Sequence, residues 1–307
     1  MKSPENLMTD RFFERVVAVL DVTGESRAIM ASAAELARHF DVGLTSLFAH
    51  NDHLRSLEGH PLVRIVDLPT GIGHPLEGGA LKMGWRALGR RMRHEHERLV
   101  RRYALEAKFE ISGRSQSEAV EERATGSELF VLGSVSRRIV GQLRGSAAGL
   151  YSSTQMPGAV LLVGATQVSF YSVVVVYDGS ALARRALEAA RRMARNNSAM
   201  VTVLTVGAGV EDIPRLRQRA RTRRGTVGER IQVYCRRLEQ PDTQAVIAAS
   251  ERLRADLIVV PASETFPATE DLPLLTAQGA RPVLIIRGQP GTDDDRRLDR
   301  VVADRTP

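Results

Sequence analysis

The chain has 307 residues, a formal net charge of +7 and 43% hydrophobic residues, as expected of a water-soluble globular protein with about two domains. Its single cysteine, Cys235, excludes an internal disulfide, and no apolar run approaches the roughly 20 residues of a membrane span. We therefore expect a cytoplasmic protein without membrane contact. The basic balance permits an acidic partner without naming one.

Short apolar runs alternate with helical patterns along the first half. The sequence predicts a buried strand over Val16–Asp21, a helix over Ser26–Phe40 with Ser26 as its N-cap, and a strand over Leu44–His50. Residues Asn51 to Gly84 are rich in Gly, Pro and His and predict a long loop. A basic helix over Trp85–Ala107, a strand near Phe109–Ile111, a helix around Ser117–Ala124 and strands over Leu129–Leu132 and Ala159–Val163 complete this half.

The pattern then begins again. The second half repeats the first strand at Val173–Asp178, the Ala-rich helix at Ala181–Ala194, and later strands at Met200–Val206, Leu257–Val260 and Pro282–Ile286. We expect a leader at 1–13, one domain at 14–166 with an insertion at about 51–107, a second domain at 171–288, and a disordered tail at 289–307. Ala159–Val163 and Pro282–Ile286 should meet at one pseudo-two-fold interface.

Strands alternating with helices predict an α/β fold made of two tandem, open, parallel-sheet domains of the Rossmann-like kind. In such sheets ligands bind at the carboxyl ends of the strands, where the strand order reverses. Asp21, Gly133, Asp178 and Pro261 all follow or end predicted strands.

The stretch from Val131 to Ser146 is the strongest candidate site. An apolar run leads into Gly133, and the loop carries Arg137, Arg138 and Arg144 before Gly145-Ser146 opens a helix-like segment. Glycine lets a backbone approach a ligand closely, and helix N-termini attract anions. A simple strand–loop–helix turn with solvated arginines is the competing interpretation.

These features together resemble tandem universal stress proteins. A strand that ends on Asp appears twice, at Val16–Asp21 and at Val173–Asp178, and the second is followed by Gly179-Ser180. Each half also ends with an apolar strand, Ala159–Val163 in the first and Pro282–Ile286 in the second. The resemblance implies a fold of the adenine-nucleotide-alpha-hydrolase type. It also implies that Asp21 and Asp178 lie beside an adenosine, although either aspartate could instead cap the following turn.

ATP-binding members of that family carry the motif G-x2-G-x9-G-[S/T] after the fourth strand. Gly133 matches its first glycine, Ser136 stands in place of the second, and Gly145-Ser146 arrives one residue early. In the second half Pro261 replaces the first glycine. The resemblance therefore implies weak ATP or AMP binding in the first half, at Asp21, Gly133, Ser136, Arg137, Gly145 and Ser146, and none in the second.

Two other polar clusters do not favour a metal or nucleic-acid site. His94-Glu95-His96-Glu97 lacks the spacing of a helical metal site. The Arg215–Arg224 run has no interleaved aromatic residues, so a solvated segment is favoured over a nucleic-acid site. No catalytic arrangement stands out.

We expect a non-enzymatic stress-response protein with intramolecular domain pairing, an unknown protein client, and a second half that is a structural or regulatory partner. A homodimer is compatible with this pattern. One alternative is a scaffold that binds an acidic protein or nucleic acid without nucleotide, and another is a slow ATPase.

Overall fold

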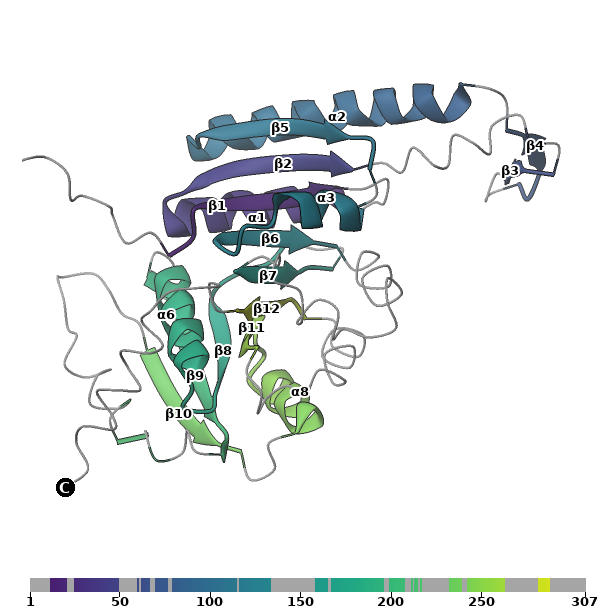
Figure 1. The fold of residues 1–307 in the computed structure, drawn as a ribbon. Coiled ribbons are helices and arrows are strands. Elements are labelled where there is room, and N and C mark those ends of the chain that lie inside the picture. The colour runs from purple at the N-terminus through teal and green to yellow at the C-terminus, as the bar shows by residue number, and fades with distance from the viewer. Residues whose placement is uncertain are drawn as a thin grey trace, which may run out of the picture.

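A computed structural model describes residues 12–20, 25–49, 60, 62–66, 70–76, 79–114, 116–133, 158–164, 167–195, 199–207, 211, 213–214, 216, 232–238, 242–262 and 281–287. Ten strands of this part form one open sheet, and a separate hairpin lies beyond one end (Figure 1). No helix within these ranges is long and apolar enough to cross a membrane.

The first half contributes five strands to the sheet. In chain order its elements are β1 (Arg15–Leu20), α1 (Ser26–Phe40), β2 (Gly43–Ala49), β3 (Arg64–Val66), β4 (Gly73–Pro75), α2 (Ala80–Tyr103), β5 (Ala107–Ser112), α3 (Gln116–Arg123), β6 (Glu128–Leu132) and β7 (Ala159–Leu162). Strands β5-β2-β1-β6-β7 lie side by side and all run parallel. The strand order therefore reverses between β1 and β6.

The second half repeats this order. Its elements are β8 (Ser172–Tyr177), α6 (Ala181–Arg195), β9 (Met200–Thr205), β10 (Gln232–Arg237), α8 (Thr243–Arg252), β11 (Leu257–Pro261) and β12 (Val283–Ile286). Strands β10-β9-β8-β11-β12 are again parallel, with the reversal between β8 and β11. Cys235, expected in a strand, lies in β10 and is half-buried.

The halves join through their last strands. β7 and β12 pair antiparallel, with Val283 opposite Leu162 and Ile286 opposite Ala159. These are the two segments that we expected to meet at a pseudo-two-fold interface. Because each strand covers the exposed edge of the other, neither half presents this edge for uncontrolled pairing.

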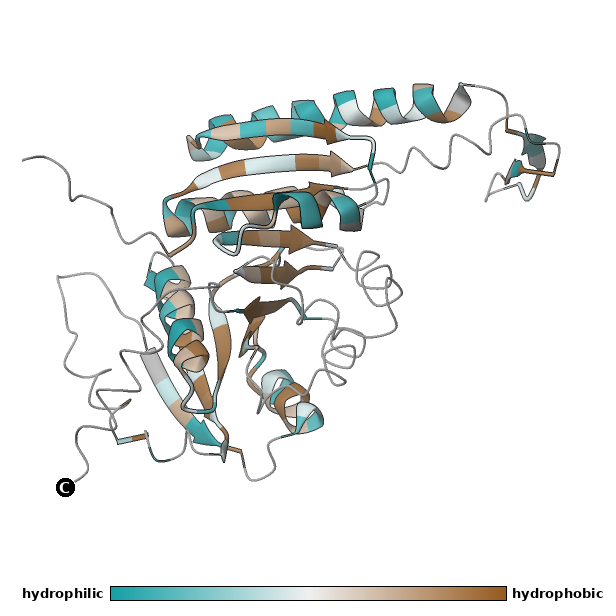
Figure 2. Ribbon diagram, in the orientation of Figure 1, coloured by the Kyte–Doolittle hydropathy of each residue, from teal (hydrophilic) through white to brown (hydrophobic). Residues whose placement is uncertain are grey.

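Helices cover both faces of the sheet, as the predicted βαβ units require. Alternate residues of β1 point to opposite faces: Val16, Ala18 and Leu20 pack with α1, α2 and α6, whereas Val17 and Val19 lie in the core beneath α3 and α8. Figure 2 shows the central strands as largely hydrophobic and the helices as mixed. The first of these cores is continuous across both halves.

The region between β2 and β5 differs from expectation. Residues Asn51 to Gly84 are not wholly loop, because they contain the β3–β4 hairpin and the first turn of α2. α2 also ends earlier than predicted, at Tyr103 instead of Ala107, since Ala104 takes a left-handed conformation (φ 51°) and its N–H bonds to the Val100 carbonyl. The chain then enters β5 at Ala107.

The last residues of the expected leader pack against the domain. Phe13 is fully buried, and its ring lies 4.9 Å from that of Phe40 in a T-shaped contact. Phe12 lies beneath the guanidinium groups of Arg185 and Arg192, each about 5.0 Å from its ring centre. This aromatic pair therefore links α1 of the first half to α6 of the second.

Candidate functional site

The strand order places the candidate site of the first half at the carboxyl ends of β1 and β6. These strands are parallel neighbours, with Ala18 opposite Val131, and they end at Leu20 and Leu132. Gly133 follows β6 directly. Of the residues expected to bind nucleotide, Asp21, Ser136, Arg137, Gly145 and Ser146 lie outside the described residues, as do Arg138 and Arg144. Among these candidate residues, Gly133 is the one that the structure describes.

Gly133 lies against a carboxylate that sequence analysis did not identify. A Cβ atom at this position would be 2.5 Å from Oε2 of Glu25 and 3.0 Å from Cδ1 of Ile29. Glu25 is half-buried and stands immediately before α1, as its N-cap residue. Only a glycine at position 133 lets the acidic side chain of Glu25 lie this close to the backbone.

This placement also corrects the start of α1. Ser26, expected as the N-cap, is instead the first helical residue and is buried. The N-cap residue Glu25 has helical φ and ψ and makes no side-chain capping bond. A carboxylate near a helix N-terminus is stabilised by the helix dipole, which is the same interaction that a ligand phosphate would use. The Glu25 carboxylate therefore occupies the space beside Gly133 at this end of the sheet.

At the corresponding end of the second half, the residues that follow β8 form hydrogen bonds with one another. Asp178, which is buried, accepts a bond at Oδ1 from the Ser180 amide (2.9 Å), and the Ser180 hydroxyl accepts one from the Ala183 amide (3.0 Å). Gly179 between them has φ 85°, a conformation that favours glycine. This bond is the turn-capping contact of one of the two interpretations of Asp178.

Proline ends the fourth strand of the second half. Pro261 is the last residue of β11 and has no N–H to donate. The next amide, of Ala262, donates to the Ile286 carbonyl of β12 (2.8 Å) and so belongs to the sheet. The two halves therefore differ at the end of this strand, where one has Gly133 and the other has Pro261.

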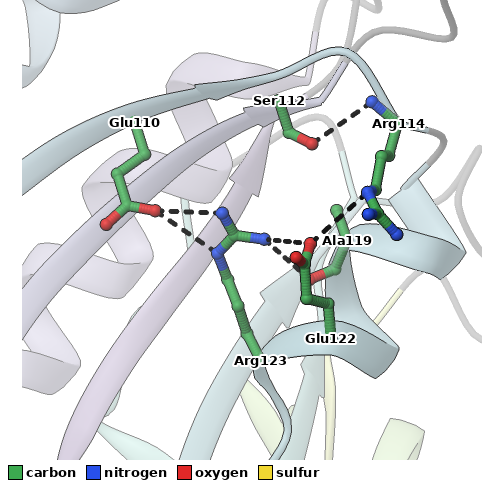
Figure 3. Close-up of polar contacts among 6 residues, drawn as sticks. All are labelled: Glu110, Ser112, Arg114, Ala119, Glu122 and Arg123. Atoms are coloured by element: carbon green, nitrogen blue, oxygen red, sulfur yellow. Dashed lines mark hydrogen bonds and ion pairs between the residues drawn. The ribbon is translucent and has the colours of Figure 1, made fainter.

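Charged residues near the end of β5 serve the fold. Arg123, at the end of α3, donates to Glu110 of β5 through Nε and Nη2 (3.3 and 3.2 Å) and pairs with Glu122 (Figure 3). Arg114 pairs with the same Glu122 at 3.7 Å. These contacts fasten α3 to the edge strand and show no arrangement of nucleophile and base.

Two buried titratable groups lie away from the strand ends. His96 of α2 shares a 2.8 Å hydrogen bond between its Nδ1 and the Ser46 hydroxyl, and burial lowers the pKa of His96. Glu128 begins β6, at the amino edge of the sheet. Burial would raise its pKa, but bonds from Thr125 and Arg15 outweigh burial and lower it. No group of three metal-ligating side chains occurs among the residues described above.

No protein-family model and no curated protein sequence matches the chain. Among solved structures, a universal stress protein from Archaeoglobus fulgidus has a TM-score of 0.59 at 15% identity, over 91% of this chain and 99% of that one. A putative universal stress protein from Pseudomonas aeruginosa has a TM-score of 0.48 at 12% identity, over 95% and 98% of the two chains. On its agreement with the first of these structures, the chain has the fold of the universal stress proteins.

Proposed function

We propose that this protein is a non-enzymatic stress-response protein whose first half binds ATP or AMP weakly and whose second half is its structural partner. The supporting observation is the difference between the two strand-order reversals. Gly133 has no side chain, so a group can lie against its backbone, as the Glu25 carboxylate does, whereas Pro261 offers no amide and Asp178 accepts a bond within its own turn. A ligand could therefore approach the backbone of the first half by displacing Glu25, and the second half lacks the corresponding glycine.

Glu25 explains why the affinity should be weak. A phosphate that approaches Gly133 must displace a carboxylate that already lies there. Two unit charges of like sign about 4 Å apart repel by about 1 kcal/mol in bulk water and by about 4 kcal/mol at an effective dielectric constant of 20. A loss of 1.4 kcal/mol is already tenfold in affinity. The carboxylate is therefore the main determinant of nucleotide affinity in this proposal.

Replacing Glu25 by glutamine tests the proposal because it removes the charge and keeps the shape. Titration calorimetry with ATP and AMP should give weak binding to the natural chain and about tenfold tighter binding to Glu25→Gln. Glu251→Gln, an exposed glutamate of α8, is the matched control and should bind as the natural chain does. Phosphate release from ATP should stay at the rate without protein.

Two results would count against this function. If neither the natural chain nor Glu25→Gln binds millimolar nucleotide, the scaffold alternative replaces it. If Glu25→Gln instead weakens binding, the carboxylate holds the ligand, for example through a cation, and does not compete with it. Steady release of phosphate from ATP would favour the slow ATPase.

A further inference from the structure

The outward face of α2 is strongly basic. The helix carries eight lysines and arginines against two glutamates. Seven of these cations are exposed and form no ion pair with any residue that the structure describes, but Arg93 and Arg102 lie over the rings of Phe109 and Tyr103. The other five are Lys82, Arg86, Arg90, Arg91 and Arg101. We call these five residues the α2 basic face. At 3.6 residues per turn they occupy an arc of about 180°.

The opposite side of α2 is fixed to the protein. Trp85, Met92 and Leu99 are buried, and the His96 side chain is bonded to Ser46 of β2. Figure 1 shows the helix along the outer edge of the sheet, at the end remote from the second half. Because the apolar side of the helix is already packed, the cations point outward from a rigid support.

Both glutamates of α2 have partners. Glu95 accepts bonds from Arg27 of α1 (3.1 Å) and from Arg98, and Glu97 lies 3.8 Å from the His94 ring. Glu95 therefore neutralises Arg27 and Arg98, which lie outside the α2 basic face. Glu97 lies within the arc of that face and lowers its formal charge from +5 to +4. Protein surfaces usually intersperse both signs, so a predominantly basic arc is a surface that attracts anionic partners.

We propose that the α2 basic face binds the phosphate backbone of a nucleic-acid double helix. Four of its five members are arginines, whose planar guanidinium groups bind phosphate oxygens in pairs. The 24 residues of α2 span about 36 Å, close to one turn of a duplex. The contact is to phosphates and is independent of base sequence, since the face has no aromatic side chain for stacking.

Other occupants fit less well. A second copy of the chain would place this face against an equally basic surface in a two-fold contact. A helix that inserts into a membrane surface carries an apolar stripe, whereas Met83 is the only large apolar side chain that α2 exposes. The Arg215–Arg224 run, for which the sequence favours a solvated segment, lies outside the described residues except for Leu216. The proposal does not depend on nucleotide binding.

The test compares two triple variants that remove the same charge from different places. Arg86→Gln/Arg90→Gln/Arg101→Gln alters the α2 basic face. Arg236→Gln/Arg237→Gln/Arg252→Gln alters exposed arginines of the second half and is the control. Glutamine is nearly as good a helix former as arginine, so α2 should persist, which circular dichroism checks. Fluorescence anisotropy with a labelled duplex of about 20 base pairs measures binding between 50 and 200 mM salt.

The natural chain should bind duplexes of unrelated sequence alike and lose affinity steeply with salt. The α2 variant should bind at least tenfold more weakly near 0.1 M salt, with a salt slope smaller by about 2–3, because each phosphate contact contributes about 0.9 to that slope. The control should stay within twofold of the natural chain. Equal weakening by both variants would overturn the proposal, as would salt-insensitive binding. Displacement of the duplex by polyglutamate at equal charge concentration would assign the face to an acidic protein instead.

Discussion

The Ser32 hydroxyl of α1 accepts a hydrogen bond from the Val168 amide at 3.0 Å, and this bond ties the connection between the halves to the first half. Gln167 adds a bond to Glu35 at 3.0 Å, and the buried Phe170 ring lies 5.3 Å from that of His39. The connecting segment is therefore packed against α1 along several residues. It holds the start of the second half against α1.

Removing Phe170 should destabilise the whole protein. The side chain is fully buried, and Phe→Ala in a core costs about 3–5 kcal/mol of unfolding free energy. Urea denaturation of Phe170→Ala measures this loss. The neighbouring Tyr171 is 65% exposed, so Tyr171→Ala should change stability by no more than about 0.5 kcal/mol. Similar losses in the two variants would mean that the connecting segment is not packed as described.

The β7–β12 pairing predicts that the halves unfold together. Leu284 of β12 is fully buried opposite Leu161 of β7, and Leu284→Ala should cost about 2–5 kcal/mol. The chain has a single tryptophan, Trp85, which lies in α2 of the first half. Its fluorescence therefore reports on the half that does not carry the substitution.

In Leu284→Ala the midpoint of unfolding should fall equally by Trp85 fluorescence and by far-ultraviolet circular dichroism. An unmoved fluorescence midpoint beside a biphasic circular dichroism curve would show two independent domains. Tyr234→Ala, which alters an exposed side chain of β10, is the control and should leave both midpoints in place.

His96 should make stability fall in mild acid. Burial lowers its pKa in the folded protein, with Arg93 adding to this effect and Glu97 opposing it. Between the ordinary pKa of about 6.5 and the lower folded value, the unfolded chain binds a proton that the folded chain does not. Unfolding free energy must therefore decrease as pH falls from 7.5 through this interval.

Denaturant titrations at several pH values between 7.5 and 5 measure this effect. His96→Gln should show a smaller decrease over the interval than the natural chain, whereas His94→Gln, at an exposed position of the same helix, should keep the natural decrease. A His96→Gln variant with an undiminished decrease would assign the effect to other groups.

Much of the architecture follows from the sequence because it depends on local periodicity. The apolar runs at Val16–Asp21 and Val173–Asp178 specify buried strands, and their recurrence specifies the repeat. The β3–β4 hairpin is not predicted because a strand of three residues is too short to show an alternation of apolar and polar residues. Gly84 lowers the helical propensity of the first turn of α2, so the sequence does not indicate its start at Ala80.

The candidate site was less predictable because its geometry depends on contacts between distant residues. Glu25 reaches Gly133 only when α1 and β6 are brought together by the fold. No spacing within the chain encodes that approach. A glycine ending a strand is the available signal, and it indicates a close neighbour without identifying it.

The two aspartates that follow the first strand of each half should respond differently to substitution. Asp178 bonds to the Ser180 amide in a turn that leads into α6, so Asp178→Ala should cost about 0.5–2 kcal/mol, as loss of a cap does. It should leave any response to nucleotide intact. Asp21→Ala lies in the first half, where Gly133 follows β6, and should remove the response to nucleotide. Thermal shift with millimolar ATP and AMP separates the two effects, because a ligand at about 100 times its dissociation constant adds about 2.7 kcal/mol of stability. A shift that survives Asp21→Ala but disappears in Asp178→Ala would place the nucleotide in the second half and contradict the asymmetry between Gly133 and Pro261.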